Sequence, residues 1–294
     1  MNQLEEHETL KKRAAKLSIL SNTTLITLKF IAGFLSGSIG IISEAIHSSS
    51  DLLASFIAFV SVSESSKPAD EDHQFGHGKY EDMSGLFEGA LIIFAAFYIV
   101  YEALKKILNP STIAMDVNIG MWVMAISALA NFLLSKYLLV VARKTDSIAI
   151  FADGEHLKTD VFSSLAVFFG LFFVQVTGNK IFDPVIAIVV AVIILFTGLK
   201  IFEQAKSNLL DCSLDEDDED KIQKVVAEYF GEHVIQLKSL RTRKAGFKKN
   251  IEMTLLVNGR MHIKKGHELC DEIERRIEEA IGNTDITIHL EPNE

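Results

Sequence analysis

Apolar runs long enough to cross a lipid bilayer occupy the chain from about Leu17 to Leu210, and they constrain its fold more than any other feature. A membrane-spanning helix needs about 20 mainly apolar residues. Polar or glycine-containing links divide this region into six runs, which we place at about residues 14–38, 39–64, 84–107, 118–142, 147–176 and 182–207. The sequence therefore predicts an α-helical membrane protein with six transmembrane helices.

After Asp211 the sequence becomes dense in charge and is typical of a small soluble domain. Helical periodicity over 219–230 and 264–281, with Gly282 as a stop signal, alternates with strand patterns over 234–243, 250–257 and 285–291. This order predicts an α+β domain of the form α-β-β-α-β. The acidic run over 215–220 fits a solvated helix start. We expect an N-terminal segment over 1–13, a transmembrane domain over 14–208 and a C-terminal domain over 209–294.

Charge predicts the orientation and excludes one class of partner. The net charge of −10, from 29 basic and 39 acidic residues, argues against nucleic acid. Cys212 and Cys270 lack metal-binding spacing, and reduced thiols are the expectation. Basic residues in short loops mark the cytoplasmic side, which predicts cytoplasmic N- and C-termini in the cell (inner) membrane. On that side lie Lys11, Lys12, Arg13, Lys16, Lys67, Lys79, Arg143 and Lys144, against Lys105, Lys106 and Lys180 on the other.

Two copies of one polar pattern lie inside apolar runs. His47-x-x-x-Asp51 is in the second run and His156-x-x-x-Asp160 is in the fifth. Residues four apart share one face of a helix, so each pair presents an imidazole beside a carboxylate. Where two such helices touch, two nitrogens and two oxygens form a tetrahedral ligand set suited to Zn²⁺ or a similar divalent ion. Ionisable groups at membrane depth are costly, so four of them in this spacing predict an ion site.

Other interpretations of the two pairs are weaker. A core histidine could be satisfied by a hydroxyl from Ser48, Ser50 or Thr159, but a His and an Asp together in lipid have few structural uses. A hydrolytic metal keeps one coordination position open for water, whereas four protein ligands fill a tetrahedron here. An emptied site would take up protons, so metal and proton compete for it. The expected activity is proton-coupled metal transport, with no enzyme activity and no organic cofactor.

A second polar cluster lies in the loop after the second run. Asp70, His73 and His77 have a spacing that suits a small metal site. Histidine and aspartate are also commonplace in cytosolic loops, and the residues alone leave both interpretations open.

The whole chain resembles the cation diffusion facilitator family, which comprises dimeric metal/proton antiporters with six spans and a cytoplasmic metallochaperone-like domain. Four features carry the resemblance: the two paired motifs, Ser36-Gly37-Ser38 at the first turn, the stretch from Phe75 to Lys79, and Leu240-Arg241-Thr242-Arg243. The resemblance implies that His47, Asp51, His156 and Asp160 form the transport site. The combination His-Asp-His-Asp looks like the zinc-selective type of the family.

The resemblance also implies further sites. It implies a second zinc site at Asp70, His73 and His77, and a charge interlock between Lys79 and Asp211 at a dimer interface. His267, His289 and Glu291 match ligand positions of a C-terminal metal cluster. Lys238 and Thr254 stand where members with a two-zinc cluster have histidine, which allows only a partial or single-metal site. The residues to which the resemblance assigns these further roles are Asp70, His73, His77, Lys79, Asp211, His267, His289 and Glu291.

Together these observations predict a homodimer in the lipid bilayer that exports Zn²⁺ from the cytosol in exchange for protons, with Zn²⁺ also as a candidate structural ion. One alternative is the same machine serving Co²⁺, Fe²⁺, Cd²⁺ or Mn²⁺. Alternatives from other classes are an intramembrane metalloenzyme and a membrane-anchored zinc sensor.

Overall fold

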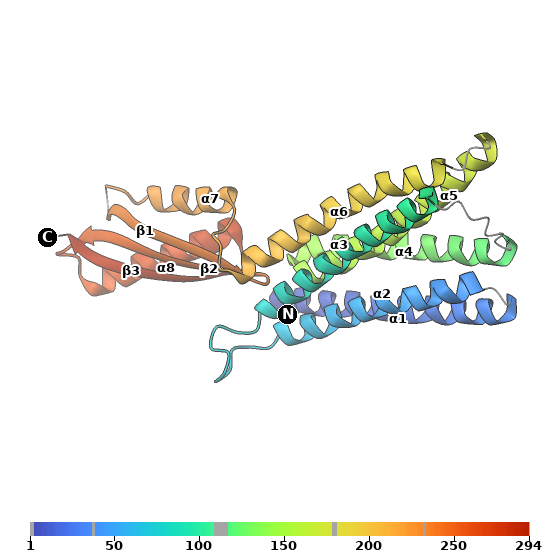
Figure 1. Ribbon diagram of the computed structural model, residues 1–294. Helices are drawn as coiled ribbons and strands as arrows, with labels where there is room; N and C mark the ends of the chain where they lie inside the picture. Colours follow the sequence, from blue (N-terminus) through green and yellow to red (C-terminus); the bar gives the residue numbers. More distant parts are fainter. Residues whose placement is uncertain (1–2, 37–38, 109–116, 178–180, 232, 294) are drawn as a thin grey trace. The chain divides into compact units, whose positions relative to one another are not determined.

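A computed structural model describes residues 3–36, 39–108, 117–177, 181–231 and 233–293 of the chain. Two compact units make up the chain, Met1–Lys206 and Ser207–Glu294. The first is a bundle of long helices, and the second combines a sheet with two helices (Figure 1).

The first unit contains the six long helices that the apolar runs predict, and the order of elements confirms that prediction. They are α1 (Gln3–Ser36), α2 (Ile39–Ser65), α3 (Lys79–Leu108), α4 (Val117–Thr145), α5 (Ile148–Thr177) and α6 (Phe182–Leu209). The first helix begins at Gln3 rather than near residue 14, so the charged segment before the apolar run is helical as well. Its Lys11 is only 1% exposed, which shows that tertiary packing extends the helix beyond its apolar part.

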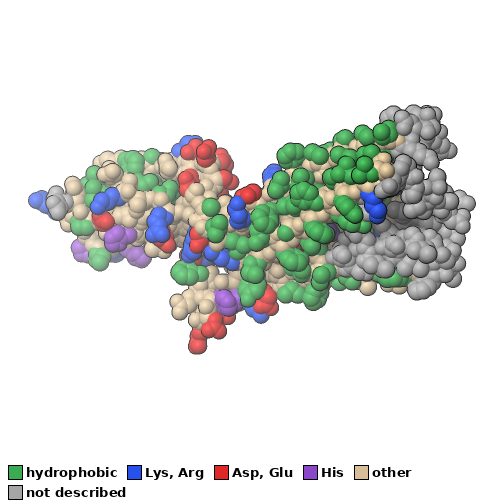
Figure 2. All heavy atoms as spheres, in the orientation of Figure 1, with side chains coloured by type: hydrophobic (Ala, Val, Ile, Leu, Met, Phe, Trp, Pro, Cys, Tyr) green, Lys and Arg blue, Asp and Glu red, His purple; other side chains and the backbone are tan. Residues whose placement is uncertain are grey.

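The outer faces of the bundle are apolar, as a lipid-facing surface requires. Figure 2 shows hydrophobic side chains over the visible faces of α3 and α6. Phe94 and Phe97 of α3 and Phe196 of α6 are strongly exposed. Within the described residues, three segments are long and apolar enough to span a bilayer: Lys79–Lys105, Ala125–Thr145 and Pro184–Leu209. The protein is thus built to place apolar side chains in lipid.

Glycines allow several helices of the bundle to approach closely. A Cβ atom added to Gly89 of α3 would lie 2.8 Å from the backbone nitrogen of Phe202 in α6, and one added to Gly85 would lie 3.0 Å from the Ile148 side chain in α5. Such contacts are typical of membrane helices, where small residues let backbones pack against each other. These two glycines let α3 pack closely against both α5 and α6.

The second unit has the predicted order α-β-β-α-β, which is confirmed. Its elements are α7 (Glu216–Ala227), β1 (Val234–Ala245), β2 (Lys248–Asn258), α8 (Ile263–Ile281) and β3 (Thr284–Asn293). The strand order is β1-β2-β3, with β1 and β2 antiparallel and β2 and β3 parallel. Helix α8 forms the crossover that a parallel pair needs. Ile222 and Val226 of α7 and Ile273 and Ile277 of α8 bury their side chains in one core with Leu255 of β2.

Local signals in the sequence explain the ends of these elements. Asp215 caps α7, because its side chain accepts a hydrogen bond from the backbone N–H of Asp218 at 2.9 Å. The acidic run therefore begins a helix, as predicted. Gly282, with φ 63°, ends α8, and Gly246, with φ 61°, lies in the turn between β1 and β2. Both are left-handed backbone conformations that favour glycine.

The two cysteines differ in environment, which predicts different reactivity. Burial raises the pKa of the Cys270 thiol to about 11, with further contributions from Glu274 and Asp271, whereas Cys212 is exposed. A raised pKa lowers the thiolate fraction at neutral pH by on the order of 100-fold. We expect iodoacetamide at pH 7.5 to alkylate Cys212 well before Cys270, as followed by peptide mass spectrometry. Equal rates at the two sites would contradict this assignment.

Candidate metal sites

The first candidate ligand pair lies on α5, within the bundle. His156 is 8% exposed and Asp160, one helical turn further on, is partly buried. Helix α5 runs through both positions, and the hydroxyl of Thr159 donates to the backbone carbonyl of Glu155 at 2.9 Å. The carboxylate of Glu155 accepts from Lys158 at 2.9 Å. The neighbouring polar residues are therefore engaged along their own helix.

The second candidate pair, His47 and Asp51, belongs to α2, but the side chains of both residues lie outside the described residues. The direction of α2 relative to α5 follows from two tertiary contacts. Ser65 of α2 and Ser147, just before α5, both donate to Glu81, and Ser55 of α2 donates to Asp153 of α5 at 2.9 Å. From the Glu81 contacts to the Ser55–Asp153 contact, residue numbers fall along α2 and rise along α5. The two helices are therefore antiparallel (Figure 1).

This antiparallel arrangement brings the two motifs to the same level of the bundle. At 1.5 Å per residue, the backbones of Asp51 and His47 lie about 6 and 12 Å beyond Ser55. Measured the same way from Asp153, the backbones of His156 and Asp160 lie about 4.5 and 10.5 Å beyond it. The helix backbones thus satisfy the geometric condition for one shared site.

The hydrogen bonds of two hydroxyls near the motifs are described by the structure. The hydroxyl of Ser48 accepts from the Lys29 ammonium at 2.6 Å, and the hydroxyl of Thr159 donates to a backbone carbonyl. Each of these two hydroxyls keeps further hydrogen-bonding capacity, so the interpretation of His47 and His156 as core histidines stays open. Ser50 lies outside the described side chains.

The loop residues Asp70, His73 and His77 converge on one point. The Asp70 carboxylate lies 3.4 Å from Nδ1 of His73 and 3.3 Å from Nε2 of His77, and the two imidazole rings are 4.3 Å apart. One ligand atom from each residue lies within 4.8 Å of the others. The structure therefore brings together the three residues singled out in the sequence.

The charge and the hydrogen bonds of this loop cluster suit a metal ion. The backbone N–H of His73 donates to the Asp70 carboxylate at 2.7 Å, which lowers the pKa of that carboxyl, and the nearby His77 lowers it further. Nδ1 of His77 lies 3.2 Å from the backbone carbonyl of Pro68. If this nitrogen donates, the Nε2 lone pair is directed to the ligand side, as in many zinc sites. Two imidazoles and a carboxylate fit Zn²⁺, with a fourth position left for water.

The C-terminal candidates are not assembled into a comparable cluster. Among the described residues, the loop triad is the only group of three potential ligands whose atoms converge within 4.8 Å. Glu291 forms an ion pair with Lys238, and the exposed His267 lies 3.6 Å from Asp271. Lys238 thus supplies a positive charge to the Glu291 carboxylate. The possibility of a metal site at His267, His289 and Glu291 receives no support from this geometry.

The two members of the predicted interlock belong to different compact units. Asp211 has φ 56° just after α6, and its carboxylate lies 3.5 Å from the Arg243 guanidinium. Lys79 begins α3 in the other unit. The Lys79–Asp211 interlock stays a prediction.

A buried charged junction at one end of the bundle was not recognised from the sequence. The ammonium of Lys11 donates to the Glu81 carboxylate at 2.6 Å, and these side chains are 1% and 0% exposed. Ser65 donates to the same carboxylate at 2.9 Å, and Ser147 also donates to it. The junction joins α1, α2, α3 and the start of α5. Its members lie far apart in sequence, and the only local signal was a carboxylate in the first turn of α3.

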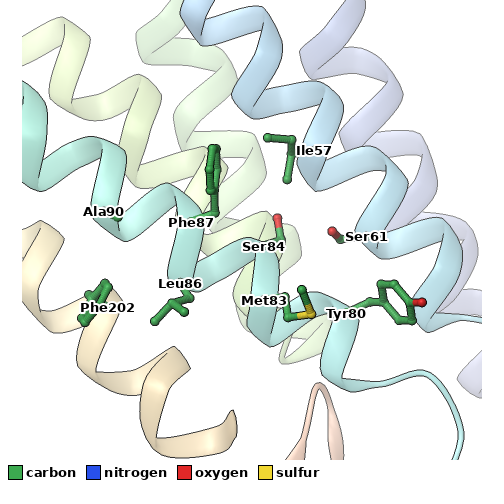
Figure 3. A pocket seen from close by; sticks show the side chains of 9 residues that line it. All are labelled: Ile57, Ser61, Tyr80, Met83, Ser84, Leu86, Phe87, Ala90 and Phe202. Carbon is green, nitrogen blue, oxygen red and sulfur yellow. The ribbon is translucent and has the colours of Figure 1, made fainter. Parts of the chain in front are cut away.

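A pocket within the bundle is a different kind of feature. It lies between α2 and α3, with Phe202 of α6 at its edge, and its walls are mainly apolar (Figure 3). Ser61 and Ser84 contribute hydroxyls, but no His, Cys, Asp or Glu lines it. The pocket therefore offers no metal ligands of the kind that the two motifs supply.

Comparisons with known proteins agree with these observations. The family model of the cation efflux transmembrane domain matches residues 15–210, and that of the cytoplasmic domain of cation efflux proteins matches residues 214–293. An uncharacterized transporter, sll1263 of Synechocystis sp., is 36% identical over 97% of this chain and 91% of its own length. Cation-efflux pump FieF of Shewanella oneidensis is 31% identical over 99% of this chain and 97% of its own length. A solved structure of CzrB in its zinc form is 31% identical, covers 28% of this chain and 91% of its own, and has a TM-score of 0.26.

A helical bundle with an apolar exterior and ionisable groups inside, joined to a small α/β domain, is typical of membrane transport proteins. The matches extend over nearly the whole chain and include both parts. The chain belongs to the cation diffusion facilitator family of cation efflux transporters.

Proposed function

We propose that this transporter exports divalent metal, with Zn²⁺ as its preferred ion, from the cytosol in exchange for protons. The site is formed by His47, Asp51, His156 and Asp160, and it opens alternately to the two sides of the membrane. The observation that carries the proposal is the Ser55–Asp153 hydrogen bond of 2.9 Å between α2 and α5. It supports a shared site because both motifs follow at the same level on these antiparallel helices.

The ligand chemistry favours zinc. Two neutral imidazoles and two carboxylates balance the charge of one divalent ion, and a mixed nitrogen and oxygen tetrahedron suits Zn²⁺ and Co²⁺. Mn²⁺ prefers oxygen ligands, and a site with two imidazoles disfavours it. Fe²⁺ and Cd²⁺ are alternative cargoes that competition experiments would separate.

Proton exchange follows from the emptied site. When the ion leaves, two carboxylates share a low-dielectric space, and protonation of an imidazole or a carboxyl relieves their repulsion. Because metal binding requires the deprotonated ligands, metal and proton exclude each other. Each inward movement of the empty site would then carry protons.

The distribution of basic residues supports an orientation with both termini in the cytosol, in the inner membrane of the cell. The match of residues 214–293 to a cytoplasmic domain supports the same orientation. We assign this domain the role of holding two copies of the chain together, with the Lys79–Asp211 pair at the interface of the dimer.

The loop triad would hold a second, structural Zn²⁺ that is not transported. We expect His77→Ala to remove one zinc per chain from the purified protein, since this buried imidazole is the best-oriented ligand of the cluster. The zinc-to-protein ratio, measured by mass spectrometry after dialysis, checks this. His262→Ala is the matched control, because His262 caps α8 and lies in no ligand cluster. An unchanged ratio in His77→Ala would remove the loop site.

The test of the proposed function is metal flux into proteoliposomes under an imposed pH gradient, with Zn²⁺, Co²⁺ and Mn²⁺ compared at equal concentrations. Zinc flux that follows the gradient, and exceeds manganese flux, is the expected result. Flux indifferent to the gradient would remove proton coupling. Stoichiometric zinc binding without flux would point to a membrane-anchored sensor instead.

A further inference from the structure

Two buried carboxylates outside the proposed transport site lie on facing helices. Glu88 of α3 and Asp153 of α5 are both 0% exposed. Glu88 follows Glu81 by seven residues and Asp153 follows Ser147 by six, so both lie about 10 Å along their helices from the Lys11–Glu81 junction. Asp160 lies about 20 Å from the same junction. Glu88 and Asp153 therefore lie between this end of the bundle and the proposed transport site, with Asp153 about 4.5 Å before His156 along α5.

Packing between α3 and α5 directs Glu88 towards α5. One turn before it, Gly85 contacts the side chain of Ile148 on α5, and one turn after it, Ile92 packs in a cluster with Ala152 of α5. Positions 85, 88 and 92 form one stripe on a helix face. Glu88 lies within electrostatic range of Asp153 and of His156.

The hydrogen bonds of Glu88 leave part of its carboxylate available to a ligand. One oxygen accepts from the Ser84 hydroxyl at 3.3 Å, and the other, Oε2, is buried with no hydrogen-bond partner among the described residues. Asp153 is anchored differently, through the Ser55 hydroxyl, which is itself held by Asn22 at 2.8 Å. A buried carboxylate oxygen without a donor is uncommon and calls for an explanation.

We infer that Glu88 and Asp153 form a transit site where a divalent cation pauses between the cytosolic end of the bundle and the transport site. This inference rests on the proposed function. A divalent ion neutralises two buried carboxylates that would otherwise repel each other in a low dielectric. Oxygen ligands hold Zn²⁺ less strongly than a set that includes imidazole nitrogen. The ion therefore passes on to His156 and Asp160, where imidazole nitrogen binds it more strongly.

The expected consequence is kinetic. Glu88→Gln keeps the shape of the side chain but removes an anionic oxygen ligand, and we expect it to lower the initial zinc flux at sub-saturating metal by about tenfold, the lower end of the loss known for groups that support a metal site. Flux at saturating zinc should stay within about twofold of wild type. Equilibrium zinc binding at the transport site, measured by calorimetry, should be retained. Glu88→Asp, which keeps the charge, should resemble wild type.

The control is Asp82→Asn. Asp82 is also a fully buried carboxylate of α3, but six residues of helix turn it to a different face from Glu88. Flux is measured in proteoliposomes over a range of zinc concentrations, beside wild type and Asp160→Ala. Three results would overturn the transit site alone. They are wild-type flux of Glu88→Gln at low zinc, a loss of flux in Glu88→Gln that is equal at all zinc concentrations, and a loss of flux in Asp82→Asn equal to that in Glu88→Gln. If the flux of the wild-type protein is no higher than that of Asp160→Ala, the proposed function and the transit site are overturned together.

Discussion

Alanine in place of Asp160 is expected to abolish metal transport, with a fall in zinc flux of roughly 100-fold or more. The substitution removes one of two carboxylates, so a bound zinc ion would keep an unbalanced positive charge at membrane depth. Groups that only orient a metal ligand already cost 10–100-fold in affinity when lost, and a direct ligand costs at least as much. The measurement is zinc uptake into proteoliposomes together with calorimetric zinc binding.

The fold should survive this change, which separates loss of a ligand from loss of structure. Asp160 is only partly buried, and deleting an ionisable group inside a membrane bundle removes a desolvation cost rather than a packing contact. Thr159→Ala is the matched neighbour, because Thr159 is adjacent to Asp160 and its hydroxyl donates to the backbone carbonyl of Glu155 in its own helix. We expect this control to transport normally. Flux in Asp160→Ala that approaches the level of Thr159→Ala would refute the assignment of Asp160.

The parts of the fold that local patterns determine could be predicted from the sequence. Alternation and turn residues gave the five elements of the C-terminal domain in order, and Gly282 marks the end of α8 as expected. The paired motifs could be placed on helices because a spacing of four residues has a direct geometric meaning. The three loop ligands converge because they lie within eight residues of each other, where a single turn decides their positions.

Features that depend on contacts between distant segments could not be predicted in this way. Lys11 and Glu81 are 70 residues apart, and Ser55 and Asp153 are 98 apart. Lys11 belongs to a charged segment that resembles a solvated terminus until its partner is known, so the start of α1 was misplaced. Glu291, a predicted metal ligand, forms an ion pair with Lys238, which lies 53 residues away in the sequence. In each case the deciding partner carries no local signal.

Glutamine in place of Glu81 is expected to destabilise the helical bundle strongly. The change leaves the Lys11 ammonium, which is 1% exposed, without the carboxylate that it contacts at 2.6 Å. Removing one partner of a buried ion pair costs about 3–5 kcal/mol. For a unit of this size, such a loss lowers the midpoint of thermal unfolding by roughly 6–20 °C. Circular dichroism of the detergent-solubilised protein measures this midpoint.

A double substitution distinguishes the ion pair from simple loss of packing. Lys11→Met and Glu81→Gln together replace both charges with neutral side chains of similar length, so the double variant should regain much of the stability lost by Glu81→Gln alone. The exposed pair of Lys67 and Glu64, which lies 2.6 Å apart, is the control, and Lys67→Met should change the midpoint little because exposed pairs contribute less than about 1 kcal/mol. Additive losses in the double variant would mean that the two charges do not stabilise each other. Recovery of stability in the double variant would show that the Lys11–Glu81 ion pair links α1 to α3, the helix that also carries Glu88.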